Sequence, residues 1–219
     1  MSQFAETDNK NLMQKNLFKA GATSALLMLV LFLIGIIGII TTLLQITIND
    51  GWLMQLYDNW LVVLFKINMG LQANLNVINL IDITIMALFC AMSLCLYPEL
   101  KKTSKIWSLI ATVLPFLGIP LFLATATAGR STLLIAGLLI SIVMLRNNTF
   151  SKSTAYVGIM ASVLLFFAGD IATAIYSSSN IIAFSIGIGY VLWMLWLLFI
   201  AQKLYQLGKS LSEDKAELK

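Results

Sequence analysis

The chain has 219 residues, of which 59% are hydrophobic and only 11% are charged, and its mean hydropathy is +0.91. These values lie far outside the range of soluble globular domains, so the composition excludes a water-soluble fold. The chain contains no histidine, which removes the usual ligand of zinc and haem and the usual general base at neutral pH. We therefore expect no metal, no cofactor and no catalytic residues. The net charge of +4 is spread over short connections, so no nucleic-acid partner is expected.

Six apolar segments are each long enough to be membrane-spanning helices. Backbone groups cannot be left unpaired in hydrocarbon, and no segment shows the strict alternation of a barrel strand, so helices are the physical choice. The sequence predicts an all-α polytopic transmembrane bundle, with a polar N-terminus over residues 1–19, a transmembrane domain over 20–205 and a charged tail over 206–219. The predicted spans are Ala20–Ile46, Asn76–Tyr97, Ile106–Ala128, Ser131–Leu145, Ala155–Tyr176 and Ile181–Leu204.

The distribution of lysine and arginine predicts the orientation, because positive residues are retained on the cytoplasmic side of a membrane. With six spans, 12 of the 14 basic residues fall on one side, and only Lys66 and Arg130 fall on the other. We therefore expect both termini in the cytoplasm. The residues on the predicted cytoplasmic side are Lys10, Lys15, Lys19, Lys101, Lys102, Lys105, Arg146, Lys152, Lys203, Lys209, Lys215 and Lys219.

The segment between the first two spans, residues 52–66, is apolar enough to be drawn as a further span. Its polar residues, Gln55, Asp58, Asn59 and Lys66, fall within an arc of about 100° on a helical wheel. This pattern is typical of a helix that lies in the membrane interface. We predict one external interfacial helix here. It acts either as an amphipathic strap that seals the bundle or as a lid, with Trp52 and Trp60 covering a site below it.

Three charged residues lie within or beside the spans, where an ionised side chain at the membrane centre costs about 2.5 to 3.5 kcal/mol. Asp82 and Asp170 each lie a short way below the external end of a predicted helix. Arg130 joins the third and fourth spans. The 15 residues of the fourth span, Ser131–Leu145, provide roughly 22 Å of helix against about 30 Å of hydrocarbon, so we expect this turn to dip inward. All three charges are thus predicted in the outer third of the membrane.

Polar neighbours suit a pocket at that level. Asn79 lies one helical turn from Asp82, and Thr173 lies on the same face as Asp170. An unpaired charge at this depth is expensive, so Arg130 is predicted within salt-bridge reach of Asp82 or Asp170. Two carboxylates against one guanidinium leave a surplus of negative charge, which favours a cation or a proton over an anion.

Two interpretations of this cluster remain open. In the structural one, Arg130 neutralises the carboxylates and the cluster only holds the helices in register. In the functional one, the cluster is an outward-facing pocket through which an integral membrane protein binds or transports a small ligand, cation or proton. The alternative function is a non-catalytic accessory or immunity-type protein that contacts another membrane protein. An intramembrane aspartyl enzyme would need Asp82 and Asp170 in a Gly-x-Gly-Asp or Tyr-Asp context, which is absent.

The sixth span carries two glycines followed by large aromatic residues. We predict that Gly187 and Gly189 permit close helix packing, and that Tyr190, Trp193 and Trp196 are bulky residues facing lipid or the interface. We do not assign any of them to the polar pocket.

Several short stretches together resemble a group of bacterial and archaeal six-helix membrane proteins that is known as a domain of unknown function. They are Leu96–Lys105 (LYPELKKTSK), the turn Thr127–Arg130, Asp170 within AGDI, and Gly187–Trp193 (GIGYVLW). The resemblance covers most of residues 18–208. It implies a multi-pass protein of a prokaryotic plasma membrane, with membrane lipids as neighbours, and carries no activity or functional residue over to this chain.

Overall fold

The computed structural model describes residues 2–43, 77–167 and 180–213, and over these ranges the chain is almost entirely helical. The helices are α1 (Ser2–Leu43), α4 (Val77–Leu100), α5 (Lys105–Ala124), α6 (Ala126–Leu145), α7 (Lys152–Leu164) and α9 (Asn180–Glu213). A short π-helical stretch over residues 165–167 extends α7. The all-α fold class is confirmed, and no strand occurs in the part of the chain that is described.

Five of these helices have an apolar stretch long enough to cross a membrane. The stretches are Leu12–Ile34, Ile81–Leu100, Lys105–Ala124, Thr127–Leu145 and Ser185–Leu211. The predicted fifth span is described only through the shorter apolar helix Lys152–Phe167, and its remainder lies outside the described residues, as does the whole predicted interfacial helix at 52–66. The chain is therefore a helical bundle with the span lengths and apolarity of an integral membrane protein.

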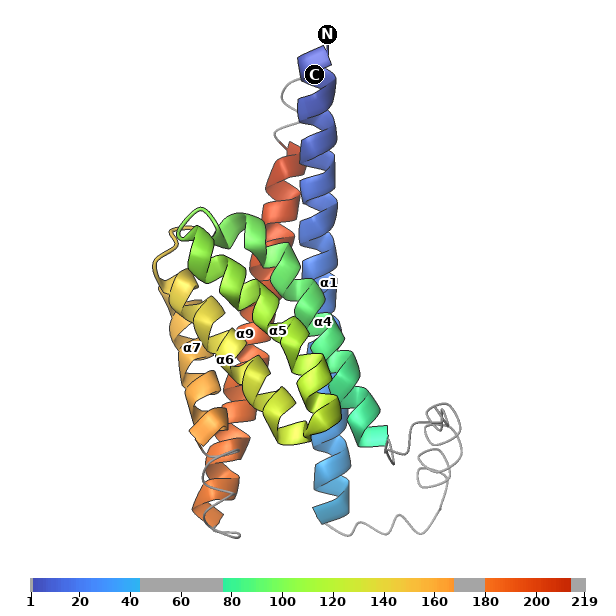
Figure 1. The fold of residues 1–219 in the computed structure, drawn as a ribbon, viewed down its shortest axis with the longest axis vertical. Coiled ribbons are helices and arrows are strands. Elements are labelled where there is room, and N and C mark those ends of the chain that lie inside the picture. The colour runs from blue at the N-terminus through green and yellow to red at the C-terminus, as the bar shows by residue number, and fades with distance from the viewer. Residues whose placement is uncertain (1, 44–76, 168–179, 214–219) are drawn as a thin grey trace.

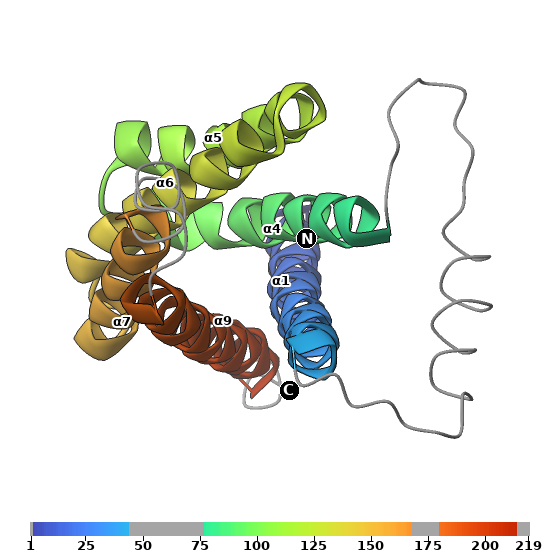
Figure 2. The same cartoon turned by 90° about the horizontal axis from the view of Figure 1, so that it is seen from below.

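Each described helix packs against the next described helix along the chain, and α9 packs against α1. Because α4 also contacts α6 directly, a ring can close without α5. Figure 2 shows this ring along the bundle, with α1, α4, α6, α7 and α9 around a common centre and α5 outside α4 and α6. The beginning of α1 and the end of α9 project together from one end of the bundle (Figure 1).

Two helix ends differ from the prediction. Helix α1 begins at Ser2, so residues 2–19 of the polar segment continue the first span as helix. Helix α9 extends to Glu213, into the predicted tail. At both helix ends, a polar part of the helix extends beyond the apolar stretch. Hydropathy marks where a helix is apolar, but main-chain hydrogen bonding can continue past that point because water tolerates exposed helix surface.

The break between α5 and α6 is a single extended residue, Thr125, with φ −150° and ψ 123°. The third span therefore ends at Ala124 rather than Ala128, and the fourth begins at Ala126 rather than Ser131. A tight reversal brings the two helices close together. A Cβ on Gly129 would lie only 2.6 Å from the Cα of Phe122, so glycine is needed where α6 passes α5.

The interior is built around aromatic rings of α9. Trp193 and Trp196 are 3% and 0% exposed, so the prediction that they face lipid or the interface is wrong. The rings of Phe89 and Trp193 stack at 17° with centroids 6.0 Å apart, and Trp193 and Trp196 lie 5.0 Å apart. Gly158 on α7 makes room for Trp196, since a Cβ there would lie 2.6 Å from the indole Cδ1.

Of the two glycines predicted to permit close packing, one does so. A Cβ on Gly189 would lie 2.8 Å from Leu165 of the neighbouring α7 end, whereas nothing lies within 4 Å of a Cβ on Gly187. Gly189 therefore sits on the side of α9 that faces α7, and Gly187 faces away from the other described helices. Large apolar side chains on the outside of the bundle, such as Ile106 at 71% and Leu123 at 61% exposed, form the surface offered to lipid.

Candidate functional site

Asp82 and Arg130 form a salt bridge that joins α4 to α6. The Nη2 atom of Arg130 donates a hydrogen bond to Oδ2 of Asp82 at 2.6 Å. The two residues are 48 positions apart in the sequence, and the prediction that Arg130 pairs with one of two aspartates is confirmed with Asp82 as the partner. The Asp82 side chain is 23% exposed and that of Arg130 is 49% exposed.

Both residues lie near helix ends at the same end of the bundle. Asp82 is in the second turn of α4, which begins at Val77, and Arg130 is in the second turn of α6, which begins at Ala126. The prediction that Arg130 lies in a turn dipping into the membrane is therefore wrong. Since α6 has 20 residues rather than 15, it spans about 30 Å at 1.5 Å per residue. Arg130 therefore lies below the end of the bundle because it is in the second turn of α6, and not because a turn dips inward.

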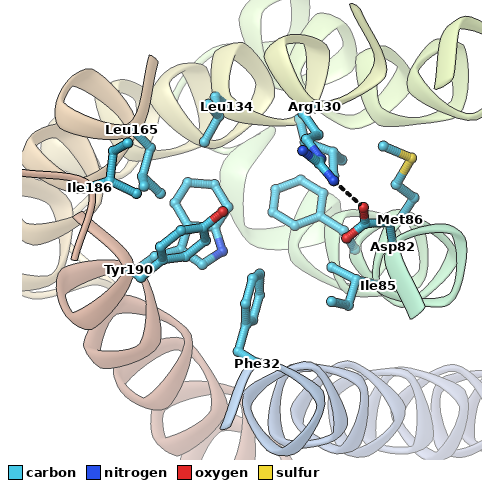
Figure 3. Close-up of a pocket in the computed structure, with 12 residues that line it drawn as sticks. Phe32, Asp82, Ile85, Met86, Arg130, Leu134, Leu165, Ile186 and Tyr190 are labelled. Carbon is cyan, nitrogen blue, oxygen red and sulfur yellow. Dashed lines mark hydrogen bonds and ion pairs between the residues drawn. The ribbon is translucent and has the colours of Figure 1, made fainter. Parts of the chain in front are cut away.

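The ion pair borders a cavity of about 250 Å³ between helices from both ends of the sequence. Figure 3 shows Asp82 and Arg130 on one side of this cavity, with Tyr190 of α9 and Phe32 of α1 facing them. Apart from the Tyr190 hydroxyl, the rest of its wall is mostly apolar. The lining residues are Phe32, Asp82, Ile85, Met86, Phe89, Arg130, Leu133, Leu134, Leu165, Ile186, Tyr190 and Trp193.

Aromatic rings form much of the cavity wall. The rings of Phe32 and Tyr190 lie 6.0 Å apart at 49° to each other, and the Phe89–Trp193 stack lies deeper in the bundle. The hydroxyl end of Tyr190 points toward the interior of the cavity (Figure 3). The cavity therefore combines a charged edge with ring faces, whose negative quadrupole attracts cations.

One oxygen of the Asp82 carboxylate remains for a ligand. Arg130 is bonded to Oδ2, and no described residue donates a hydrogen bond to Oδ1. The second oxygen lies on the cavity side of the ion pair in Figure 3. A carboxylate has about four acceptor sites, so it can hold Arg130 and a second donor at once.

The other predicted site residues are not brought into this site by the described structure. Asn79 lies in the first turn of α4, with its side chain outside the described part. Asp170 and Thr173, and the two predicted lid residues Trp52 and Trp60, lie outside the described residues. Within those residues the site holds one carboxylate and one guanidinium, which balance formally. The predicted surplus of negative charge thus depends on Asp170 and stays a prediction.

Sequence reasoning missed the apolar lining of the cavity, although a periodic signal was present. Asp82, Met86 and Phe89 are spaced i, i+4, i+7 on α4, which places them on one face of a helix. Ile186, Tyr190 and Trp193 repeat the same spacing on α9. A search for aromatic residues on the face of each intramembrane charge would have found Phe89.

No group of three or more acidic or cysteine side chains that could hold a metal ion occurs among the described residues. Comparison with protein-family models, with curated proteins and with solved structures gives no match for this chain. The function is therefore inferred from the geometry of the cavity.

Proposed function

We propose that this chain is a multi-pass protein of a prokaryotic plasma membrane that binds, and transports, a small cationic ligand or a proton through the cavity beside Asp82 and Arg130. The observation that carries the proposal is the cavity itself. A purely structural ion pair needs no adjoining space, whereas here about 250 Å³ adjoins a carboxylate that keeps one oxygen without a donor among the described residues.

The chemistry of the wall favours an organic cation over an anion. A cationic group would share the Asp82 carboxylate with Arg130, and its carbon atoms would contact Phe32, Tyr190 and Trp193. Aromatic faces and a carboxylate are the partners that proteins use for ammonium groups. An anion would gain only the Arg130 guanidinium, which is already bonded to Asp82.

The proposed orientation places the cavity in the outer half of the membrane. Arg130 lies at the cavity end of the bundle, while the other described lysines and arginines lie in the half where α1 begins and α9 ends. The positive-inside rule assigns the lysine-rich end to the cytoplasm. The cavity then opens on the external side, where a ligand arrives first.

Tryptophan fluorescence tests the binding step because Trp193 lines the cavity. Purified protein is titrated with three aromatic probes of similar shape: benzyltrimethylammonium, neutral benzyl alcohol and anionic benzoate. We expect the ammonium probe to bind most tightly, and Asp82→Asn to weaken its binding by at least about tenfold because a charge-assisted contact is lost. A Trp193→Phe variant should remove most of the signal.

The matched control is Glu213→Gln, which removes a carboxylate at the far end of α9 and should leave the affinity unchanged. Uptake of the ammonium probe into vesicles that contain the protein then tests transport. Equal binding of all three probes, or ammonium binding that survives Asp82→Asn, would overturn the proposal. The accessory or immunity-type protein that contacts another membrane protein would then be the better account.

A further inference from the structure

A second cavity, of about 190 Å³, lies between α5 and α6 at the opposite end of the bundle from the Asp82–Arg130 pair. Its apolar wall is formed by Trp107 of α5 and by three residues of α6, Leu139, Ile142 and Val143. Its polar edge consists of Arg146, Thr103 and Ser104. The cavity is thus apolar along the two helices and polar at the end where α5 begins and α6 ends.

Charge at the polar edge is unbalanced. Arg146 is the C-terminal cap of α6 and is exposed, and no carboxylate of the described residues pairs with it. Two cations of the preceding loop are engaged elsewhere, since Lys102 pairs with Glu99 at 2.7 Å and Lys101 lies 5.7 Å from the ring centre of Tyr97. An anionic group placed beside Arg146 would gain a charge-assisted hydrogen bond.

Hydrogen-bond donors at the start of α5 also favour an anionic group at this edge. Ser104 is the N-cap residue of α5, yet its side chain makes no capping hydrogen bond. The first N–H groups of the helix therefore have no side-chain acceptor from the N-cap. An oxyanion at the cavity edge would complement both these groups and the guanidinium of Arg146.

The apolar part of the cavity faces outward. Trp107 is 52% exposed and Ile142 is 40% exposed, on helices that are long and apolar enough to cross a membrane. In a bilayer these surfaces contact acyl chains. The occupant that matches both halves carries an anionic phosphate at one end and a hydrocarbon chain at the other.

We infer that this groove is a binding site for an anionic phospholipid of the leaflet at this end of the bundle. The phosphate contacts Arg146 and the hydroxyl groups of Thr103 and Ser104, and one acyl chain lies along Trp107 and Ile142. Basic pockets between membrane helices bind anionic lipid head groups by this combination. The inference is independent of the proposed function, because it uses a different cavity and different residues.

The test measures which lipid lies against Trp107. The full chain is reconstituted into phosphatidylcholine vesicles in which a minor share of the lipid is brominated on its acyl chains, as either phosphatidylglycerol or phosphatidylcholine. Bromine quenches nearby tryptophan, and subtracting the signal of a Trp107→Phe variant isolates that residue. We expect a preference of about fivefold for phosphatidylglycerol at Trp107, the contribution of one basic residue near a membrane surface.

Arg146→Gln should abolish this preference, while Arg146→Lys should keep most of it. Lys209→Gln, which removes a cation of α9 away from the groove, is the matched control and should keep it fully. If Arg146→Gln does not fold, the wild-type protein still decides the matter, because raising the ionic strength should reduce an electrostatic preference. Equal quenching of Trp107 by the two lipids, or a preference unchanged in Arg146→Gln, would overturn the inference.

Discussion

Removing Arg130 should destabilise the protein more than removing Arg130 and the Asp82 charge together. In Arg130→Ala the Asp82 carboxylate, only 23% exposed, loses its cation at the edge of an apolar cavity. The double variant Arg130→Ala/Asp82→Asn carries the same truncation but leaves no unpaired charge. Their difference therefore reports the isolated carboxylate rather than the lost packing of the arginine stem.

The expected size follows from the partial burial of the pair. Exposed ion pairs contribute about 0.2 to 1 kcal/mol, and breaking a fully buried one costs about 3 to 5 kcal/mol. With the two side chains 23% and 49% exposed and the Nη2 and Oδ2 atoms 2.6 Å apart, we expect a coupling free energy of about 1 to 2 kcal/mol, after allowing for solvent screening.

Unfolding in detergent of the wild type, the two single variants and the double variant completes the cycle. The control cycle combines Asp82→Asn with Arg146→Ala, whose residues lie at opposite ends of the bundle and should lose stability additively. Additive losses for Asp82 and Arg130 as well would contradict this prediction, because the salt bridge would then contribute nothing to folding.

Three further predictions concern packing and topology. Gly158→Ala should cost about 1 to 3 kcal/mol of unfolding free energy in the same assay, because its Cβ would overlap Ser141 Oγ, whereas Gly187→Ala, with nothing within 4 Å, should change stability little. A membrane-impermeant maleimide should label Gln55→Cys and not Lys102→Cys in intact cells, with little background because both native cysteines are buried; the reverse pattern would invert the predicted orientation. A spin label at position 55 should report the depth of the head groups, as an interfacial helix requires, and a position at the membrane centre would contradict it.

The pairing of Arg130 was predictable from energetics alone. A guanidinium within the membrane needs a carboxylate, and the chain has few candidates at the right depth. The position of Arg130 relative to the start of α6 was predicted less well. The point at which the chain reverses between two helices depends on how closely those helices can approach each other. Gly129 against Phe122 and the extended Thr125 allow a reversal of one residue, so α6 begins earlier than hydropathy indicated.

The aromatic wall of the cavity was not predictable in the same way. An aromatic residue in a membrane helix satisfies hydropathy equally well when it faces lipid or the interior. Trp193 and Trp196 face inward because glycines on other helices leave space for their rings: a Cβ on Gly137 would lie 2.5 Å from the Trp193 ring. Such complementarity exists only between segments far apart in the sequence.

The helical class, the approximate spans and the need for a partner for Arg130 can all be predicted from the amino-acid sequence alone. Each of these follows from the free-energy cost of placing an unpaired peptide group or an unpaired charge in hydrocarbon, and this cost applies to each segment independently of its neighbours. The three-dimensional packing was needed to show that Asp82 pairs with Arg130 and that Phe32, Tyr190 and Trp193 surround the space beside the pair. The ring closes through contacts between α1 and α9, and no local property of either helix specifies which faces meet.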